Sequence, residues 1–229
     1  MVPLQIGRVW WTGARPTAPG PGAAWYAEVK GMVRKFHFER EGVQGLHEAL
    51  VGEDPKMRQM AAVFLGQTAD TAHITGLIDA LHDRDKQVRA CAVEGLVAIG
   101  SGAVPGLIAA LQDEWWVVRY RAAEALGRIR DEGALSALEH ALGDEKDHVR
   151  YMAAKGLGGY ARQSSVDPLA PCLEDENEYV RKRAALSLGA IGGGRARALL
   201  TARHQKEQHP EVREAIAGAL EGAAPSPSS

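Results

Sequence analysis

The sequence predicts an all-α fold: an α-solenoid of about six helix pairs with a period of about 31 residues, preceded by a degenerate N-terminal capping helix. Three observations support this prediction. An arginine recurs at nearly constant spacing, a leucine stands seven residues after it in every unit, and the residues around them place apolar side chains on one face of a helix. A unit this short cannot bury its apolar stripe alone, so neighbouring units are expected to stack.

The repeat is clearest in its arginine column. Successive arginines are separated by 31, 30, 31, 31 and 32 residues. These arginines are Arg58, Arg89, Arg119, Arg150, Arg181 and Arg213. The leucines of the matching column are Leu65, Leu96, Leu126, Leu157, Leu188 and Leu220. The agreement of six units at both columns gives the register in which every other position is compared.

Each unit reads as a short first helix, a polar turn and a longer second helix. The second helix is well shown by residues 115–130, where one face carries Val118, Ala122, Leu126 and Ile129. First helices are expected at residues 103–112 and 132–142. The turns begin with aspartates that we expect to be helix N-caps, namely Asp113, Asp144 and Asp175. Close helix approach is expected at the glycines one position beyond the leucine column, which are Gly66, Gly127, Gly158 and Gly189.

Outside the regular units, the register divides the chain into three parts. Residues 1–22 are expected to be an extension and linker, residues 23–222 the repeat solenoid, and residues 223–229 a disordered tail. Within the solenoid, the apolar stripe over residues 25–36 is interpreted as the N-terminal cap. The last unit has Gln205 where a leucine is due, which suits a C-terminal cap.

The repeat pattern D-x-x-x-x-VR-x-x-A-x-x-ALG-x-IG resembles the HEAT-like repeat of phycobilin lyase subunits over roughly residues 40–222. The resemblance implies an armadillo-like α-solenoid whose second helices line a concave face. It is highly specific for the fold and weakly specific for function, because the same module serves unrelated tasks.

Composition excludes several classes of function. The formal net charge is −2 with both signs interspersed, which argues against a dedicated nucleic-acid surface or a polybasic membrane binder. We expect no transmembrane helix, because no apolar run approaches about 20 residues, and no secretory signal. The two cysteines, Cys91 and Cys172, lie in different repeats and are expected to stay reduced in the cytoplasm.

The sequence shows no set of catalytic or metal-binding residues. Deoxyhypusine hydroxylase, another protein with HEAT-like repeats, has His-Glu pairs just after the arginine that hold a di-iron centre. Here no unit has that pair, and the only such dipeptide is His47-Glu48 in a first helix. No HExxH motif, nucleophile elbow or glycine-rich phosphate loop is present. We therefore expect a protein that is not an enzyme and holds neither cofactor nor metal.

The arginine column itself has two interpretations. It could be a ladder of anion-binding groups, or each arginine could pair with a turn aspartate inside the solenoid. The structural interpretation is favoured, because the arginine recurs in every unit regardless of the surface around it.

The outward positions of the second helices carry the candidate binding site. Large aromatic rings with basic side chains beside them occupy adjacent units, and Trp, Tyr and Arg are the types enriched at binding hot spots. The alternative is that some rings simply cover alanine-rich helix surface, and Trp115 is ambiguous because it lies at a turn. The predicted partner-binding residues are Met60, Val63, Trp116, Tyr120, Arg121, Arg128, Tyr151, Met152, Lys155, Tyr179, Lys182 and Arg183.

The leading hypothesis is a non-catalytic scaffold that binds a helix or peptide of another protein on the concave face. A second hypothesis, implied by the resemblance, is a chromophore-binding or transfer protein whose Arg121, Lys155 and Arg183 meet the propionates of a bilin. A third is nucleic-acid binding in a helical-repeat groove. The interspersed acids Glu124, Asp147 and Glu178 weigh against it.

Overall fold

The computed structural model describes residues 38–222, with side chains from residue 44 onward. Contacts divide the chain between Gly42 and Val43, inside the first described helix, so the account below concerns residues 43–222. Three predicted features lie outside the described residues: the extension over residues 1–22, the capping helix over residues 25–36 and the tail over residues 223–229.

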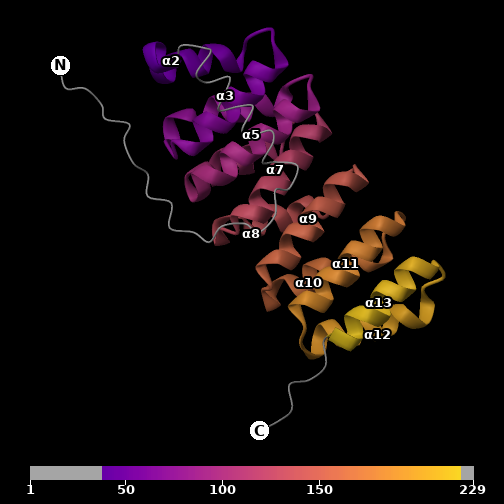
Figure 1. Cartoon of the computed structure of the whole chain (residues 1–229). Helices are drawn as coiled ribbons and strands as arrows, with labels where there is room; N and C mark the ends of the chain where they lie inside the picture. The colour runs from indigo at the N-terminus through magenta and orange to yellow at the C-terminus, as the bar shows by residue number, and fades with distance from the viewer. Residues whose placement is uncertain (1–37, 223–229) are drawn as a thin grey trace, which may run out of the picture. The chain divides into compact units, whose positions relative to one another are not determined.

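Six helix pairs follow one another along the described chain, which confirms the predicted all-α solenoid (Figure 1). The first helices are α2 (Phe38–Leu50), α4 (Ile74–Asp79), α6 (Val104–Ala110), α8 (Leu135–Ala141), α10 (Val166–Leu169) and α12 (Gly193–Lys206). The second helices are α3 (Pro55–Gln67), α5 (Lys86–Ile99), α7 (Trp116–Ile129), α9 (Asp147–Tyr160), α11 (Glu178–Ile191) and α13 (Pro210–Gly222). No strand occurs between residues 38 and 222.

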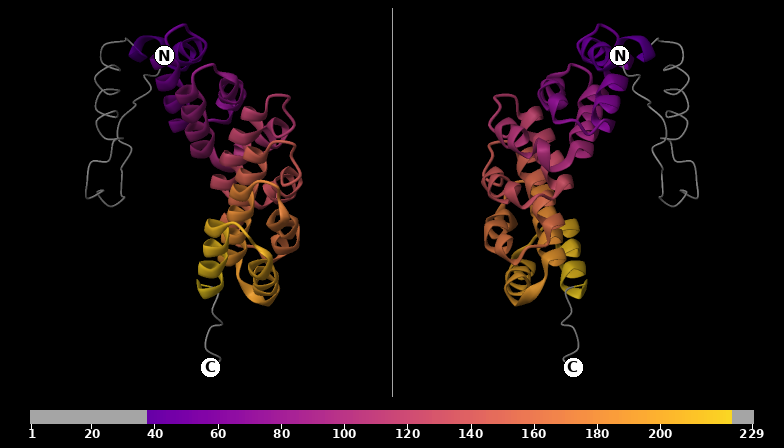
Figure 2. Two further views of the ribbon diagram at one scale, coloured as in Figure 1. Left: turned by 90° about the vertical axis from the view of Figure 1, so that its right-hand side faces the viewer. Right: turned by 90° about the vertical axis from the view of Figure 1, so that its left-hand side faces the viewer.

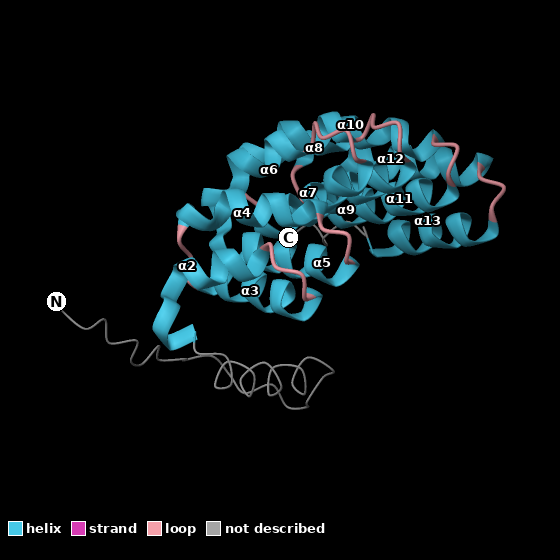
Figure 3. Ribbon diagram, turned by 90° about the horizontal axis from the view of Figure 1, so that it is seen from above, coloured by secondary structure: helices cyan, strands magenta, loops and turns pink. Residues whose placement is uncertain are grey.

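The helices form two layers. In the view of Figure 3, α4, α6, α8, α10 and α12 lie on one side and the row from α3 to α13 lies on the other. The side views show the same stacking of first beside second helices (Figure 2). Several first helices are shortened by flanking 3-10 turns, such as Gly100–Ala103 before α6.

The leucine column forms the middle of a continuous core. Leu65, Leu96, Leu126, Leu157 and Leu188 are fully buried, and all belong to one cluster that runs through every unit. In α7 the predicted apolar face is also buried at Val118 and Ala122, whereas Ile129 near the end of the helix is half-buried. Burying each leucine stabilises the fold by roughly 1.5–3 kcal/mol, so the stacked core is the main source of stability.

The arginine column is the predicted structural ladder. Arg119 donates from Nη1 to the carbonyl oxygen of Asp113 in its own turn (2.8 Å) and from Nε to the Asp144 carboxylate in the next turn (2.7 Å). The same bridge to the next turn joins Arg58 to Asp83, Arg150 to Asp175 and Arg181 to Glu207. These four guanidinium groups therefore each tie one unit to the next.

The prediction that the helix N-caps are Asp113, Asp144 and Asp175 is wrong. The N-cap residues stand two positions later and are Trp115, Lys146 and Asn177. The aspartates instead accept a hydrogen bond from the backbone N–H of those residues, at 2.8, 2.8 and 2.9 Å, which closes an Asx-type turn. In the units of Asp144 and Asp175 this turn holds the carboxylate where the arginine reaches it.

Glycine permits the closest contacts between second helices, as predicted. A Cβ added at Gly127 would lie 2.7 Å from the Cα of Gly156, and one added at Gly66 would lie 2.2 Å from the Cα of Gly95. Real side chains do not tolerate such distances. At these positions the backbones of neighbouring helices touch directly.

One stretch departs from the expectation about membrane segments. Residues Lys86–Ala110 are long and apolar enough by composition to span a membrane. In the structure they form two helices, α5 and α6, because Gly100 ends α5 with φ 77°. Their apolar residues, including Leu96 and Leu107, are part of the solenoid core.

Candidate functional site

We call the outward surface of α3, α5, α7, α9, α11 and α13 the second-helix face. Its aromatic side chains lie on three successive helices. Trp116, Tyr120 and Tyr151 are half-buried and pack against the core with part of each ring, whereas Tyr179 is 61% exposed. None of the four is enclosed inside the stack, so all of them can contact a ligand.

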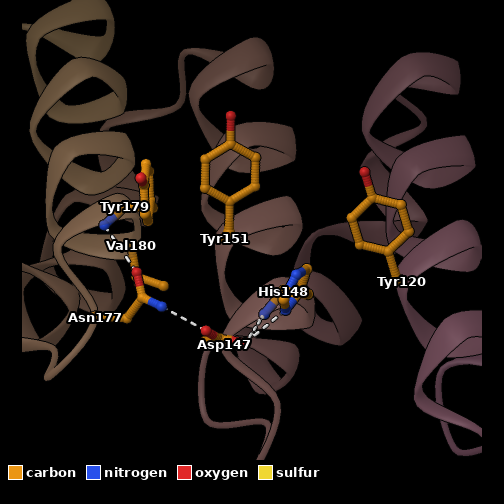
Figure 4. A pocket seen from close by; sticks show the side chains of 7 residues that line it. All are labelled: Tyr120, Asp147, His148, Tyr151, Asn177, Tyr179 and Val180. Carbon is orange, nitrogen blue, oxygen red and sulfur yellow. Dashed lines mark hydrogen bonds and ion pairs between the residues drawn. The ribbon is translucent and has the colours of Figure 1, made fainter.

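The three tyrosines line one pocket of about 250 Å³, which we call the tyrosine pocket (Figure 4). Tyr120 comes from α7, Tyr151 from α9 and Tyr179 from α11. The repeat sets this arrangement, because Tyr120 and Tyr151 occupy the same register position in consecutive units. The remaining lining residues are Asp147, His148, Asn177 and Val180.

Polar groups form the floor of the tyrosine pocket. Asp147 accepts a hydrogen bond from Nδ2 of Asn177 and contacts Nδ1 of His148 at 2.6 Å. Burial raises the pKa of Asp147, but hydrogen bonds from the side chain and backbone of His148 outweigh it, so the pKa lies below its ordinary value. At neutral pH Asp147 is therefore ionised, and its Oδ2, which among the described residues accepts only from Asn177, can accept a further hydrogen bond. On the other side of His148, its ring lies 5.1 Å from that of Trp116.

Two arginines hold the tyrosine rings in place. Arg183 reaches back from α11, donates from Nη2 to the Tyr151 hydroxyl (2.8 Å) and lies 5.0 Å from the centre of its ring. Arg121 lies 5.4 Å from the Tyr120 ring and forms an ion pair with Glu124 at 2.7 Å. Such cation–π contacts contribute about 0.5–1 kcal/mol at exposed sites. Both rings are thereby ordered before a ligand arrives.

Two predicted binding residues are buried. Met60 is 2% exposed and Met152 is 4% exposed, so the outward orientation expected for them is wrong. Both stand two positions after the arginine. On α11 this position leans towards the preceding second helix, as Arg183 shows by reaching Tyr151. The flexible thioether side chain of Met152 lies beside α7, whose Ala123 and Glu124 line the same cavity.

The other predicted residues are spread over the second-helix face. Val63 is half-buried, and Lys182 pairs with Glu211 at 3.1 Å. Arg128 forms a two-pronged ion pair with Glu94 of α5, at 2.6 and 2.7 Å. Lys155 is exposed and forms no ion pair with another described residue. Of the three groups expected to meet bilin propionates, Arg121 and Arg183 already have partners, namely Glu124 and the Tyr151 hydroxyl.

Sequence reasoning missed Asn177 and did not include Asp147 or His148 among the binding residues. All three stand at the start of a second helix, where the turns of adjacent units lie next to each other. Their registers, three or four positions before the arginine for Asp147 and Asn177, would have placed them beside the aromatic positions.

The side chains suited to redox or metal chemistry do not gather at this face. No group of three His, Cys, Asp or Glu side chains among residues 44–222 is arranged to hold a metal ion. Burial raises the pKa of the Cys91 and Cys172 thiols to about 11. Both thiols are therefore protonated at neutral pH and are poor nucleophiles.

Comparison with known proteins identifies the family. The family model described as HEAT repeats matches residues 74–150 and 140–221, more than half of the chain. The chain is a member of the HEAT repeat family. No curated protein sequence matches it.

Solved structures share the fold. The complex of CpcE and CpcF of phycocyanin lyase from Nostoc sp. PCC7120 is 25% identical with a TM-score of 0.62, covering 66% of this chain and 99% of that chain. A designed armadillo repeat protein in complex with the peptide (KR)4 is 22% identical with a TM-score of 0.53, covering 80% and 99%. A chain from a structure of Kap95p with RanGDP is 15% identical with a TM-score of 0.62, covering 88% and 33%. The last two likenesses concern the fold alone.

Proposed function

We propose that this protein is a non-catalytic, cytoplasmic scaffold whose second-helix face binds an extended or helical peptide segment of another protein. One observation carries the proposal: three tyrosines from successive repeats, two of them held by arginines, share a pocket whose floor offers a hydrogen-bond acceptor. The rings supply a large contact area at low cost in conformational entropy. Asp147 supplies a polar contact for a peptide N–H.

The fold supports the same assignment. Repeat solenoids present long surfaces suited to chains rather than closed cavities suited to small substrates. Tyr120, Tyr151 and Tyr179 lie on α7, α9 and α11 and line one pocket, so a single bound segment can contact all three rings.

A displayed peptide library tests the proposal. Selection on the wild-type protein should enrich a common motif, and the enriched peptide should bind at least tenfold more weakly to Tyr179→Ala. Because the Tyr179 ring is 61% exposed, this change should leave the thermal midpoint within about a degree. Val51→Ala is the matched control, since Val51 is 83% exposed and lies after α2, outside the second-helix face. No enriched motif, or equal binding to Tyr179→Ala, would contradict the proposal.

A bilin-handling function is the second candidate, and the likeness to the phycocyanin lyase subunits favours it. Of the cations expected to meet the propionates, Lys155 is free to do so. Adding biliverdin to the protein and recording its absorbance separates the two functions. A shifted spectrum that is lost in Lys155→Gln would favour this candidate, and an unchanged spectrum would leave the peptide-binding function.

A further inference from the structure

A second cavity, of about 500 Å³, opens on the second-helix face between α5, α7 and α9. It lies towards the carboxyl ends of these helices, whereas the tyrosine pocket lies towards their amino ends. Three of its lining residues are cations: Arg128, Arg130 and Lys155. We call it the cationic pocket.

The charge in the cationic pocket is not balanced by the protein. Arg128 pairs with Glu94, and Glu124, the one acid in the lining, pairs with Arg121. Arg130 and Lys155 form no ion pair with any other described residue. Two positive charges are therefore left facing the cavity.

The helix dipoles do not fully neutralise these two positive charges. Each helix end carries about half a negative charge, so the ends of α7 and α9 together offset about one of the two unpaired cations. The dipole effect also falls off within the last turn, and Lys155 lies outside the last turn of α9, which ends at Tyr160. A surplus of positive charge remains.

Glycines and the Arg130 side chain form the floor of the cationic pocket. Gly127 and Gly156 bring α7 and α9 together, and the Arg130 guanidinium lies across Gly159, with Nε 3.4 Å from where a Cβ would be. A side chain at Gly159 would therefore touch the guanidinium. Apolar groups of Val97 and Met152 complete the wall.

We infer that the cationic pocket receives an acidic side chain of the same bound peptide, an inference that rests on the proposed function. Charge complementarity favours a carboxylate, and the apolar wall with Glu124 close by favours one acidic residue in a mixed peptide over a polyanion. On α9, Tyr151 and Lys155 are one turn apart, or ~6 Å, and on α7 Tyr120 and Arg128 are ~12 Å apart at 1.5 Å per residue. An extended peptide covers these distances in about two to four residues.

The predicted ligand therefore carries an apolar or aromatic residue followed or preceded by an acid two to four positions away. The probe is an eight-residue Gly/Ser peptide, blocked at both ends, with one phenylalanine and one glutamate three residues apart. Two companions replace the glutamate with glutamine or with lysine. Titration followed by protein NMR measures even millimolar dissociation constants.

The glutamate probe should bind about fivefold more tightly than the glutamine probe and more tightly still than the lysine probe. Lys155→Gln, a conservative change at an exposed mid-helix site, should remove most of that preference, and Lys155→Gln with Arg130→Gln should abolish it. Arg195→Gln is the matched control, because Arg195 is exposed on α12 in the other layer. Equal binding of the glutamate and glutamine probes, or a preference that survives the double variant, would overturn the inference.

Two further arms separate the possible failures. If inorganic phosphate shifts the Lys155 and Arg130 signals while the probes show no glutamate preference, the pocket binds free anions and the inference fails. A probe with alanine in place of phenylalanine reports on the tyrosine pocket. Loss of affinity with that probe and with Tyr179→Ala, without any glutamate preference, keeps the proposed function and discards only the inference. A glutamate preference without any loss of affinity for the alanine probe or for Tyr179→Ala would keep the cationic pocket as a binding site and discard the role of the tyrosine pocket.

Discussion

The contact between α7 and α9 and the contact between α5 and α7 occupy equivalent places in the repeat array, but different residues form them. Between α7 and α9 the backbones touch at Gly127 and Gly156, and Arg119 bridges to Asp144. Between α5 and α7 the position of Gly127 is taken by Val97. Arg89 there donates to the carbonyl oxygen of Asp83 (2.6 Å) and to no carboxylate among the described residues. These two helices also pack less extensively than any other successive pair of second helices.

Other side chains make contacts where the bridge is missing. Nε2 of His82 lies 2.8 Å from the Asp113 carboxylate, and the Arg89 guanidinium lies 5.3 Å from the centre of the Trp115 ring. On the second-helix face, Arg128 and Glu94 add an ion pair between α7 and α5. The comparison teaches that the glycine contact and the arginine bridge occur together. Where Val97 replaces the glycine, the two helices pack less extensively and the arginine makes no bridge to the next turn.

The largest difference is expected from the arginines themselves. Arg119→Gln leaves the Asp144 carboxylate without its buried partner and should lower the free energy of unfolding by about 3–5 kcal/mol. Arg89→Gln should cost about 1 kcal/mol or less, because it breaks only hydrogen bonds to carbonyl groups and a ring contact. Urea denaturation of both variants measures this. Equal losses would show that the bridge does not distinguish the two contacts.

Acid should weaken the contact between α11 and α13, where the bridging carboxylate is that of Glu207. Burial opposes ionisation of Glu207, but hydrogen bonds from Arg181, His209 N–H and Arg203 lower its pKa to about 2. A carboxyl group with a lowered pKa stabilises the fold above its unfolded pKa, and that contribution is lost as pH falls through about 4.5 to 2. It amounts to roughly 3 kcal/mol. Wild type should lose stability over this range more steeply than Glu207→Gln, as measured by urea denaturation at stepwise pH. Parallel curves would contradict the assignment.

Adding a methyl group tests the direct backbone contact between α7 and α9. In an ordinary helix interior, Gly→Ala stabilises by about 0.5–1 kcal/mol. Gly127→Ala should instead destabilise by about 1–3 kcal/mol, because the new Cβ would lie 2.7 Å from the Cα of Gly156. Gly218→Ala inside α13, where nothing lies within 4 Å of the new Cβ, is the matched control. Thermal unfolding of the two variants decides, and a stabilised Gly127→Ala would mean that α7 and α9 can move apart freely.

The smallest effect is expected for the contact between Arg89 and the Trp115 ring, which lies where the arginine bridge is missing. Trp115 is 37% exposed, and Trp115→Ala should cost about 1 kcal/mol through loss of its contact with Arg89. Trp115→Phe keeps an aromatic face and should recover most of the loss. A cost above about 3 kcal/mol would place the ring in the core rather than at the surface of the contact.

The fold could be predicted from the sequence because each position can be aligned with the equivalent positions of five other units. The arginine, leucine and glycine columns predicted the helix pairs, the ladder and the close contacts between helices. The prediction failed where two roles share one residue type: Asp144 resembles an N-cap in sequence, but its carboxylate closes a turn and accepts the arginine.

The candidate site was predicted less completely. The tyrosines were found because large rings are unusual on an outward helix face. Met60 and Met152 were misplaced because the register gives the direction of a Cα–Cβ bond but not where a flexible side chain ends. Arg130 was missed because it follows the end of α7 in a left-handed conformation, with φ 58°, outside the helical register.

The most direct test of the account is the location of the bound peptide. A photoreactive benzoylphenylalanine placed at Tyr179 should crosslink to a peptide selected on the wild-type protein, and the same group placed at Arg195, in the layer of first helices, should not. Crosslinking at position 195 and not at 179 would place the partner on the other layer and contradict the proposal that the second-helix face is the binding surface.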